Sequence, residues 1–169
     1  MFDTNIFNHI LDNEIKAEDL MGKGLFFITH IQEDEINNTK DEGRKKQLVG
    51  VFNIVGSNDV PTSSAVFGVS KWGRAKFGAN PISSDSSTWG VTQWDKKEWT
   101  KEDGLYRPIK EKLDRLNKCK ANNSKDSLIA ETSIKNNFTL ITHDKDLYSV
   151  TTFFHGSCAN IYQVLGTLE

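Results

Sequence analysis

Carboxylates cluster around one short stretch of the chain, where a strand ends and a helix begins. Residues 138–142 are short, β-branched and aromatic, which predicts a buried strand of a parallel sheet. Asp144 and Asp146 follow the carboxyl end of this strand, the edge at which open α/β sheets bind ligands. Asp126 falls in the first turn of a helix that we expect Ser124 to cap. Chemistry is therefore expected at this edge.

Acids also follow the two earlier strands that the sequence predicts. Asp3 comes directly after the first of them, where it would also serve as an ordinary helix cap. Glu35 lies in the helix after the second strand, and Glu33 is the alternative, because the helix dipole favours acids in the first turn. With Ile31 and Ile36 facing the core, residue 35 points to the rim of the sheet. We therefore prefer Glu35 as the site residue.

Four carboxylates at one rim would repel one another unless a cation lay between them. Mg²⁺ and Mn²⁺ are hard ions that take oxygen ligands, often a few carboxylates with waters and substrate phosphates. One or two such ions activate a water and stabilise the leaving oxygen of a phosphodiester. Asp146 is an additional acid that we assign as a further metal ligand, with an outer group or a helix cap as the alternatives. Thr4, Asn5 and Thr142 would orient carboxylates or simply cap helices and strand ends.

The elements that must position these acids alternate between strands and helices. This alternation predicts an α/β fold, a three-layer α/β/α sandwich with a mostly parallel central sheet. Parallel strands place their carboxyl ends on one side, so acids from distant segments meet there. We expect strands at 1–2, 25–28, 138–142 and 159–165, and helices at 6–12, 17–21, 30–36, 40–55, 108–118 and from Ser124 to about 135, where Asn136-Asn137 suits a helix end.

Residues 56–107 interrupt this pattern with an irregular insertion rich in Gly, Ser, Pro and Thr. All four tryptophans lie within it, which argues against a disordered linker. We expect a short helix near 70–77. Lys71, Arg74 and Lys76, interleaved with Trp72 and Phe77, are one candidate set for binding phosphates and unpaired bases of RNA, and the aromatics would equally pack the insertion onto the body.

Composition limits the remaining classes of protein. At 169 residues a single domain, 1–169, is expected, and the net charge of −2 neither announces nor excludes a nucleic-acid partner. No apolar run has the length of a membrane helix, and an acid at position 3 argues against a signal peptide. Cys119 and Cys158 have no metal or redox spacing, which favours reduced thiols in a cytoplasmic protein. His30 and His143 flank the rim, and a structural role is favoured for both.

Four motifs together resemble those of the PIN-domain nucleases, nearest to the VapC-like toxins of toxin–antitoxin pairs. They are Asp3-Thr4-Asn5, Thr29 with Glu35 six residues later, Asp126-Ser-Leu-Ile-Ala130 and Leu140-Ile-Thr-His-Asp144-Lys-Asp146-Leu147. The resemblance covers roughly 1–55 and 108–165, with the motifs in the order found in the family. The insertion at 56–107 is longer than typical toxins of the family carry, so details of partner and substrate are not transferred.

The resemblance implies a PIN-like α/β/α sandwich and a Mg²⁺- or Mn²⁺-dependent endoribonuclease. The acids of the family fall on Asp3, Glu35, Asp126 and Asp144. An antitoxin partner and a homodimer are further implications, and the apolar helix faces within 6–11 and 48–55 could form a dimer or the chain's own core. The alternatives are a PIN-like nuclease of RNA maturation, DNA processing or phage defence, and a non-catalytic α/β scaffold for protein binding.

Overall fold

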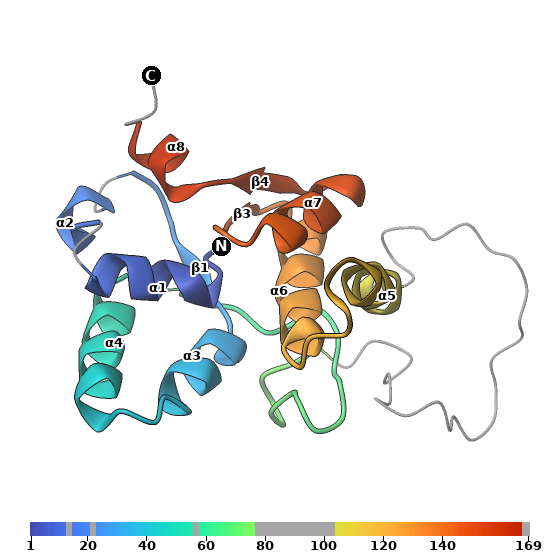
Figure 1. Cartoon of the computed structure of the whole chain (residues 1–169), viewed down its shortest axis with the longest axis horizontal. Coiled ribbons are helices and arrows are strands. Elements are labelled where there is room, and N and C mark those ends of the chain that lie inside the picture. The colour runs from blue at the N-terminus through green and yellow to red at the C-terminus, as the bar shows by residue number, and fades with distance from the viewer. Residues whose placement is uncertain (13–14, 21–22, 56–57, 77–103, 167–169) are drawn as a thin grey trace, which may run out of the picture.

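The computed structural model describes residues 1–12, 15–20, 23–55, 58–76 and 104–166, which form a mixed structure of helices and short parallel strands (Figure 1). The helices are α1 (Thr4–Leu11), α2 (Ala17–Leu20), α3 (His30–Asn37), α4 (Glu42–Val55), α5 (Tyr106–Asn117), α6 (Asn123–Lys135), α7 (Lys145–Phe153) and α8 (Ile161–Leu165). The strands are β1 (Phe27–Ile28), β2 (Asn58–Asp59), β3 (Thr139–Ile141) and β4 (Ser157–Ala159). Within these ranges, no helix has both the length and the hydropathy needed to cross a membrane.

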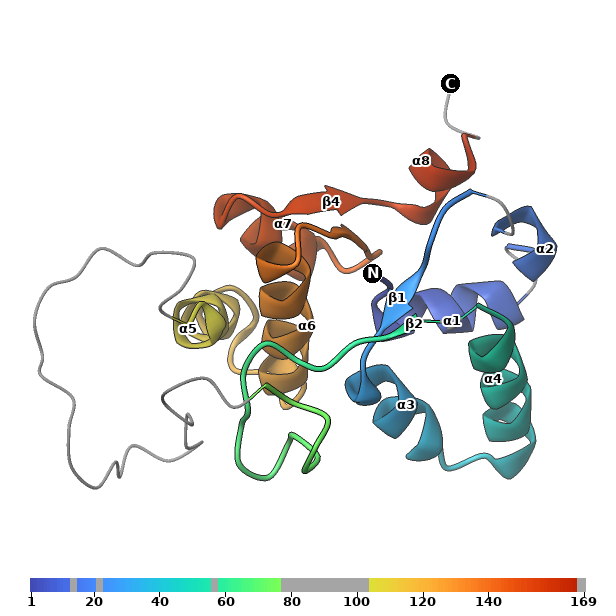
Figure 2. The ribbon, with the colours of Figure 1, turned by 180° about the vertical axis from the view of Figure 1, so that it is seen from behind.

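Residues 1–3 join two pairs of parallel strands. β1 pairs with β2, and β3 pairs with β4. Phe2 N donates to Phe27 O at 3.1 Å on one side, and Asp3 N donates to Ile141 O at 3.0 Å on the other. Phe2 and Ile141 also form a parallel bridge. Residues 1–3 therefore lie between β1 and β3, near the middle of the molecule (Figure 2). Asp3 is the last of them and the cap of α1.

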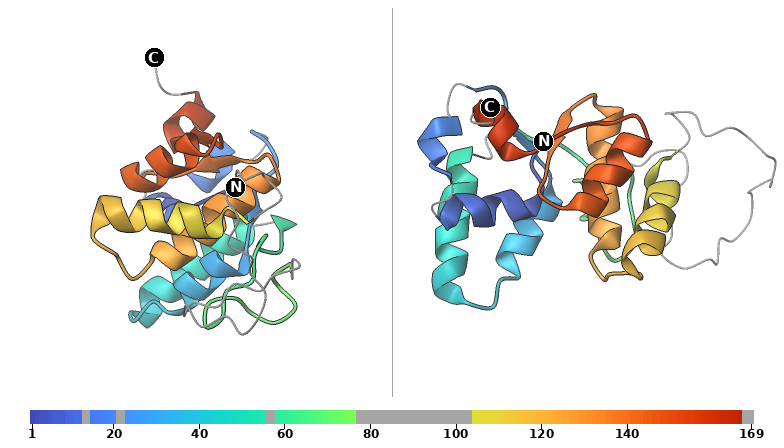
Figure 3. Two further views of the ribbon diagram at one scale, coloured as in Figure 1. Left: turned by 90° about the vertical axis from the view of Figure 1, so that its right-hand side faces the viewer. Right: turned by 45° about the horizontal axis from the view of Figure 1, so that its top comes forward.

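Alternation along these segments creates a hydrophobic core on each face. Met1 and Leu140 belong to one core, whereas their neighbours Phe2 and Ile141 belong to the other, as expected for strands with a period of two. The first core contains buried side chains of α5, α6 and α7, and the second contains those of α1, α2 and α4. Figure 3 shows the amino terminus between these two groups of helices. Apolar burial on both faces thus holds residues 1–3 in place.

Several predicted elements are found near their expected positions. Asp3 caps α1, and its carboxylate accepts a hydrogen bond from Thr4 N. The helix α6 ends at Asn136, with Asn137 in the left-handed conformation at φ 56°. The apolar residues considered for a dimer, among them Ile6, Phe7 and Leu48, are buried in the chain's own core. The mixture of helices and short parallel strands confirms the predicted α/β class.

The prediction for the last elements is wrong. Residues 159–165 do not form a strand: the strand β4 ends at Ala159 and the helix α8 follows. Asn160 and Gln163 form a capping box, in which each side chain accepts a backbone hydrogen bond from the other residue at 2.8–2.9 Å. This local pairing starts a helix in a segment whose apolar residues also suit a strand. The helix α7 was not predicted.

Two helix starts also differ from the prediction. Ser124 does not cap α6, which begins at Asn123 after Asn122, a cap residue without a side-chain hydrogen bond. The amide of Asn123 is buried and donates to Asp114 Oδ1 at 2.6 Å, so α5 fixes where α6 starts. The helix α5 begins at Tyr106, two residues before Pro108, because the buried Tyr106 anchors its first turn in the core.

The predicted helix near 70–77 is not formed in its described part. Residues 70–76 make turns and a parallel bridge between Thr62 and Ala75, held by Lys76 N donating to Thr62 O at 2.7 Å. Phe77 and the tryptophans at 89, 94 and 99 lie outside the described residues. Only the two ends of the predicted insertion are therefore part of the structure presented here.

Gly156→Ala is expected to lower the free energy of unfolding by about 1–3 kcal/mol, because it overpacks the turn between α7 and β4. A Cβ there would lie 2.6 Å from Thr151 Cγ2 and 2.7 Å from Ile134 Cγ1, and both residues are buried. Gly50 is the matched control, an exposed helical glycine in α4 with nothing within 4 Å of an added Cβ. Gly50→Ala should stabilise by about 0.5–1 kcal/mol. Urea unfolding measures both; equal effects would contradict the packing described.

Candidate active site

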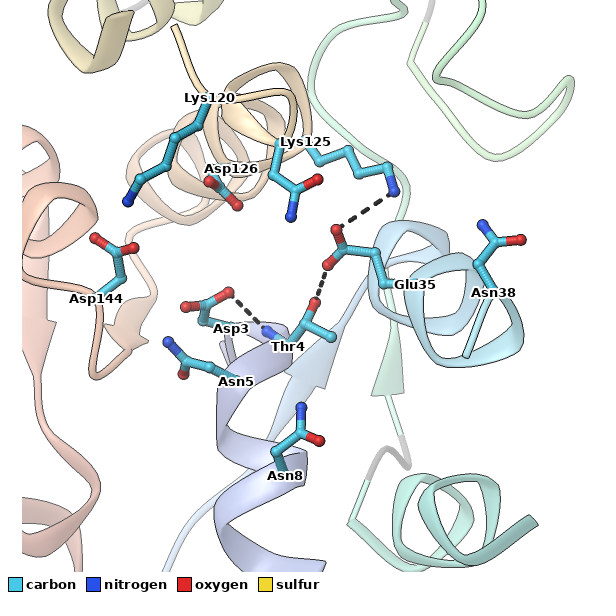
Figure 4. A pocket seen from close by; sticks show the side chains of 11 residues that line it. Asp3, Thr4, Asn5, Asn8, Glu35, Asn38, Lys120, Lys125, Asp126 and Asp144 are labelled. Carbon is cyan, nitrogen blue, oxygen red and sulfur yellow. Dashed lines mark hydrogen bonds and ion pairs between the residues drawn. The ribbon is translucent and has the colours of Figure 1, made fainter. Parts of the chain in front are cut away.

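A cavity of about 500 Å³ opens where residues 1–3 and β3 end and where α1, α6 and α7 begin (Figure 4). This is the side of a parallel sheet at which ligands bind in α/β proteins. All four predicted acids line it, although they come from four separate segments of the chain. The lining residues are Asp3, Thr4, Asn5, Asn8, Glu35, Asn38, Lys120, Asn122, Lys125, Asp126 and Asp144. We refer to this cavity as the acidic pocket.

Asp3 is the most deeply buried of the four acids, with 5% of its surface exposed. Its Oδ1 accepts a hydrogen bond from Thr4 N at 2.7 Å, and its Oδ2 accepts one from Thr142 Oγ1 at 2.6 Å. Burial raises the pKa of Asp3 to about 6; the two hydrogen bonds oppose this shift, and the charges of Glu35 and Asp144 add to it. Asp3 is therefore both a helix cap and a pocket acid.

Asp144 is held by the start of α7. Its Oδ1 accepts hydrogen bonds from Asp146 N at 2.8 Å and Leu147 N at 2.9 Å, which caps the helix. Thr142 Oγ1 accepts from Asp144 N at 3.0 Å while it donates to Asp3. One threonine at the end of β3 thus fixes two acids of the pocket. Thr142 has the orienting role considered from the sequence.

Glu35 lies on the opposite side of the pocket, on α3. Its carboxylate accepts a hydrogen bond from Thr4 Oγ1, and its Oε1 lies 3.4 Å from Lys125 Nζ. Glu33 does not line the pocket and forms an ion pair with Arg74 instead. Two residues of helix separate these glutamates by about 200° around the axis, so they point to different sides. The structure thus places Glu35, and not Glu33, beside Asp3.

Asp126 projects from the first turn of α6 into the pocket (Figure 4). Within the described part of the chain, no hydrogen bond or ion pair reaches its carboxylate. Burial raises the pKa of Asp126 to about 8; the carboxylates of Asp3, Glu35 and Asp144 add to the shift, and Lys120 opposes it. Asp126 is therefore the acid for which the pocket supplies the least compensation.

Asp146, the fifth predicted ligand, does not line the acidic pocket. It lies in the first turn of α7, its side chain is 38% exposed, and its Oδ2 is 3.9 Å from Lys120 Nζ. It lies outside because Asp144, as the cap, turns inward and the next helical residues turn away. We therefore no longer assign Asp146 as a metal ligand, and regard it as an outer partner of Lys120.

The two histidines are not pocket residues. His30 is buried, and its Nε2 accepts a hydrogen bond from Lys71 N at 3.2 Å. His143 lines a neighbouring cavity of about 330 Å³ and lies against the ring of His9 at a centroid distance of 4.2 Å. Neither histidine is therefore placed to act as a base among the four acids.

Two of the three basic residues expected to hold RNA are engaged elsewhere. Lys71 forms an ion pair with Asp34, and Arg74 pairs with Glu33 and Asp59. These contacts fasten the segment 60–76 to α3 and β2. The cations at the pocket itself are Lys120 and Lys125, which the sequence analysis missed. Their signal was position, since they precede or open the helix that carries Asp126.

The donor set of the pocket is chemically suited to a hard divalent cation. It consists of carboxylate oxygens, amide oxygens and a hydroxyl, and the charges of neighbouring acids add to the raised pKa values of Asp3 and Asp126, a repulsion that a cation would offset. Among the described residues, no three His, Cys, Asp or Glu side chains are arranged to hold one ion directly. Mg²⁺ fits this arrangement through one or two carboxylates with retained waters.

Stability without metal is expected to fall as the pH rises from about 4 to about 8. Both folded-state pKa values, about 6 for Asp3 and about 8 for Asp126, exceed the unfolded values. The folded chain therefore holds protons that the unfolded chain has already released, so raising the pH favours unfolding. Urea unfolding in EDTA measures the slope, which Asp126→Asn should reduce. A slope of the opposite sign would contradict the charge repulsion described.

A scan against models of protein families, a search of curated proteins and a search of solved structures each gave no match for this chain. The function is therefore inferred from the residues of the acidic pocket.

Proposed function

We propose that this chain is a Mg²⁺- or Mn²⁺-dependent endoribonuclease that hydrolyses phosphodiester bonds in RNA, and that it is the toxin of a type II toxin–antitoxin pair. The observation that carries the nuclease proposal is the meeting of Asp3, Glu35, Asp126 and Asp144 in one pocket. The toxin assignment depends only on the motif resemblance.

A PIN-like three-layer sandwich is the fold that we propose with this function. It is supported by the hydrophobic cores on both faces of the strands and by the position of residues 1–3 between β1 and β3. In that arrangement the end of the first segment, at Asp3, lies beside the end of β3, at Thr142. The hydrogen bond between these two residues supports the same placement.

Asp3, Glu35, Asp126 and Asp144 would hold the cation, one or two of them directly and the others through its waters, and the bound cation would supply a nucleophilic hydroxide and neutralise charge on the scissile phosphate. The chain's own residues do the positioning. Thr142 orients Asp3 and Asp144, and the hydroxyl of Thr4 orients Glu35. The lysines and asparagines of the rim provide the donors that a negatively charged RNA strand requires beside four acids.

Cleavage of labelled single-stranded RNA by the purified chain tests the proposal. We expect cleavage with Mg²⁺ or Mn²⁺ and none in EDTA, with the same sequence as DNA cut more slowly. Equal cleavage of RNA and DNA would overturn the RNA preference, and no metal-dependent cleavage of either would overturn the nuclease. Co-expression with a small neighbouring reading frame tests the toxin assignment, since an antitoxin should suppress the cleavage.

A further inference from the structure

Two lysines give the acidic pocket a positive wall. Lys120 lies in the connection between α5 and α6, and Lys125 lies in the first turn of α6. Figure 4 shows that both enter from the same side, Lys125 directed to Glu35 and Lys120 on the side of Asp144. The opposing carboxylates come from α3 and from the starts of α1 and α7. Lys120 and Lys125 thus face Asp3, Glu35 and Asp144 across one opening.

The ion pair between Lys125 and Glu35 is only partly open to solvent. Lys125 Nζ lies 3.4 Å from Glu35 Oε1, and the two side chains are 29% and 14% exposed. Glu35 also accepts the hydroxyl of Thr4, so its position is fixed from α1. The lysine has a flexible four-carbon stem and can move its ammonium group to another acceptor. Glu35 is thus the fixed member of the pair and Lys125 the movable one.

Charge determines which acceptor would replace Glu35 as the partner of Lys125. A phosphate of RNA cannot approach four carboxylates without added positive charge. A divalent cation bound at Glu35 competes with Lys125 for the same oxygens and repels its ammonium group. Lys125 then lies next to the place where the phosphate must enter. A lysine binds phosphate as a point charge, without a fixed fork geometry, and so needs no second residue to orient it.

We propose, on the basis of the function proposed above, that Lys125 exchanges partners: it pairs with Glu35 in the metal-free protein and binds a phosphate oxygen of the RNA when a divalent cation engages Glu35. Two opposite effects follow. Removing the charge of Lys125 strengthens cation binding, because a competitor for Glu35 is lost. The same change weakens RNA binding, because a phosphate contact is lost. A lysine with a purely structural role would produce neither effect in this combination.

Lys125→Met, which keeps the stem and removes the charge, tests this exchange against Lys45→Met. Lys45 is a matched control, because its side chain is also 29% exposed and also pairs with a helical glutamate, Glu42, at 3.9 Å. Calorimetric titration with Mn²⁺ should give a several-fold lower dissociation constant for Lys125→Met than for the unsubstituted chain. Lys45→Met should match the unsubstituted chain.

RNA binding is measured by fluorescence anisotropy with Mn²⁺ present, using a labelled single-stranded RNA with phosphorothioate linkages that slow its cleavage, so that all four pocket acids stay in place. Lys125→Met should weaken binding and reduce the slope of log K against log salt by about 0.7, the value for one lost phosphate contact on a single strand. Lys45→Met should leave the slope unchanged.

Three results would overturn the exchange. Unchanged or weaker Mn²⁺ binding by Lys125→Met would show that the lysine does not compete for Glu35. An unchanged salt slope would show that it does not contact phosphate. If the unsubstituted chain binds neither Mn²⁺ nor RNA, the proposed function fails together with the exchange. If it binds both and Lys125→Met behaves like Lys45→Met, only the exchange fails.

Discussion

Asp126→Asn is expected to lower Mn²⁺-dependent RNA cleavage on the order of 10³-fold, the scale on which removal of one preorganised charged or polar group acts in active sites. The pKa of Asp126 is raised to about 8, further than that of Asp3 at about 6, and no hydrogen bond from the described residues holds its carboxylate. A carboxylate without hydrogen bonds and with a raised pKa is the group whose ionised form a bound cation stabilises most. A gel assay with end-labelled RNA, at saturating Mn²⁺, measures the loss.

Asp146→Asn is the matched control for this substitution. It removes the same charge from the first turn of a neighbouring helix, but its side chain lies outside the acidic pocket and beside Lys120. Activity should remain within a few-fold of the unsubstituted chain. Asp126→Asn should also fold, because it removes a carboxyl group whose raised pKa opposes folding at neutral pH. Full activity of Asp126→Asn, or equal losses from both variants, would contradict the assignment of the pocket.

Glu35→Gln is expected to reduce cleavage on the order of 10²-fold, since it removes a charged group that faces the reacting phosphate but leaves the other three acids in place. The neutral amide also loses its ion pair with Lys125. The hydroxyl of Thr4 can still donate to the remaining carbonyl oxygen, so we expect the local structure to persist. Initial rates at several Mn²⁺ concentrations measure the effect.

Glu33→Gln separates this role from the general effect of an acid on α3. Glu33 pairs with Arg74 near the surface, and its loss should cost at most about 1 kcal/mol of stability. Cleavage should be close to that of the unsubstituted chain. The reverse pattern, with Glu33→Gln inactive and Glu35→Gln active, would show that the wrong glutamate has been assigned.

The position of the acids could be predicted from the sequence because each follows a short buried strand or opens a helix. Asp3 comes directly after Phe2, which bridges to β3, and Asp144 lies three residues beyond the end of β3, so the parallel arrangement brings them to one edge. Glu35 was distinguished from Glu33 by its spacing from Thr29 in the motif resemblance and by the inward direction of Ile31 and Ile36, both of which are buried. Apart from that resemblance, these inferences need only local periodicity and the direction of parallel strands.

The rest was missed for two different reasons. The capping box of Asn160 and Gln163 is a local signal for a helix, but the apolar residues of the segment 159–165 also suit a strand. The other features depend on tertiary contacts that no local pattern contains. The start of α6 is set by contacts of Asn123 with α5. In the sequence, Lys125 cannot be distinguished from any exposed helical lysine. Its place beside Glu35 depends on where α6 lies relative to α3. The direction of Asp146 could not be predicted either: it lies two residues after Asp144 but faces away from the acidic pocket.

We propose that the acidic pocket binds a hard divalent cation through one or two of its four carboxylates, and an anomalous difference map from a crystal soaked in Mn²⁺ tests this claim most directly. We expect a strong peak inside the pocket, within ligand distance of Asp126 and at least one of Asp3, Glu35 or Asp144. We expect the peak to disappear in Asp126→Asn. A well-diffracting crystal with Mn²⁺ peaks only at other sites, or with none, would contradict the claim.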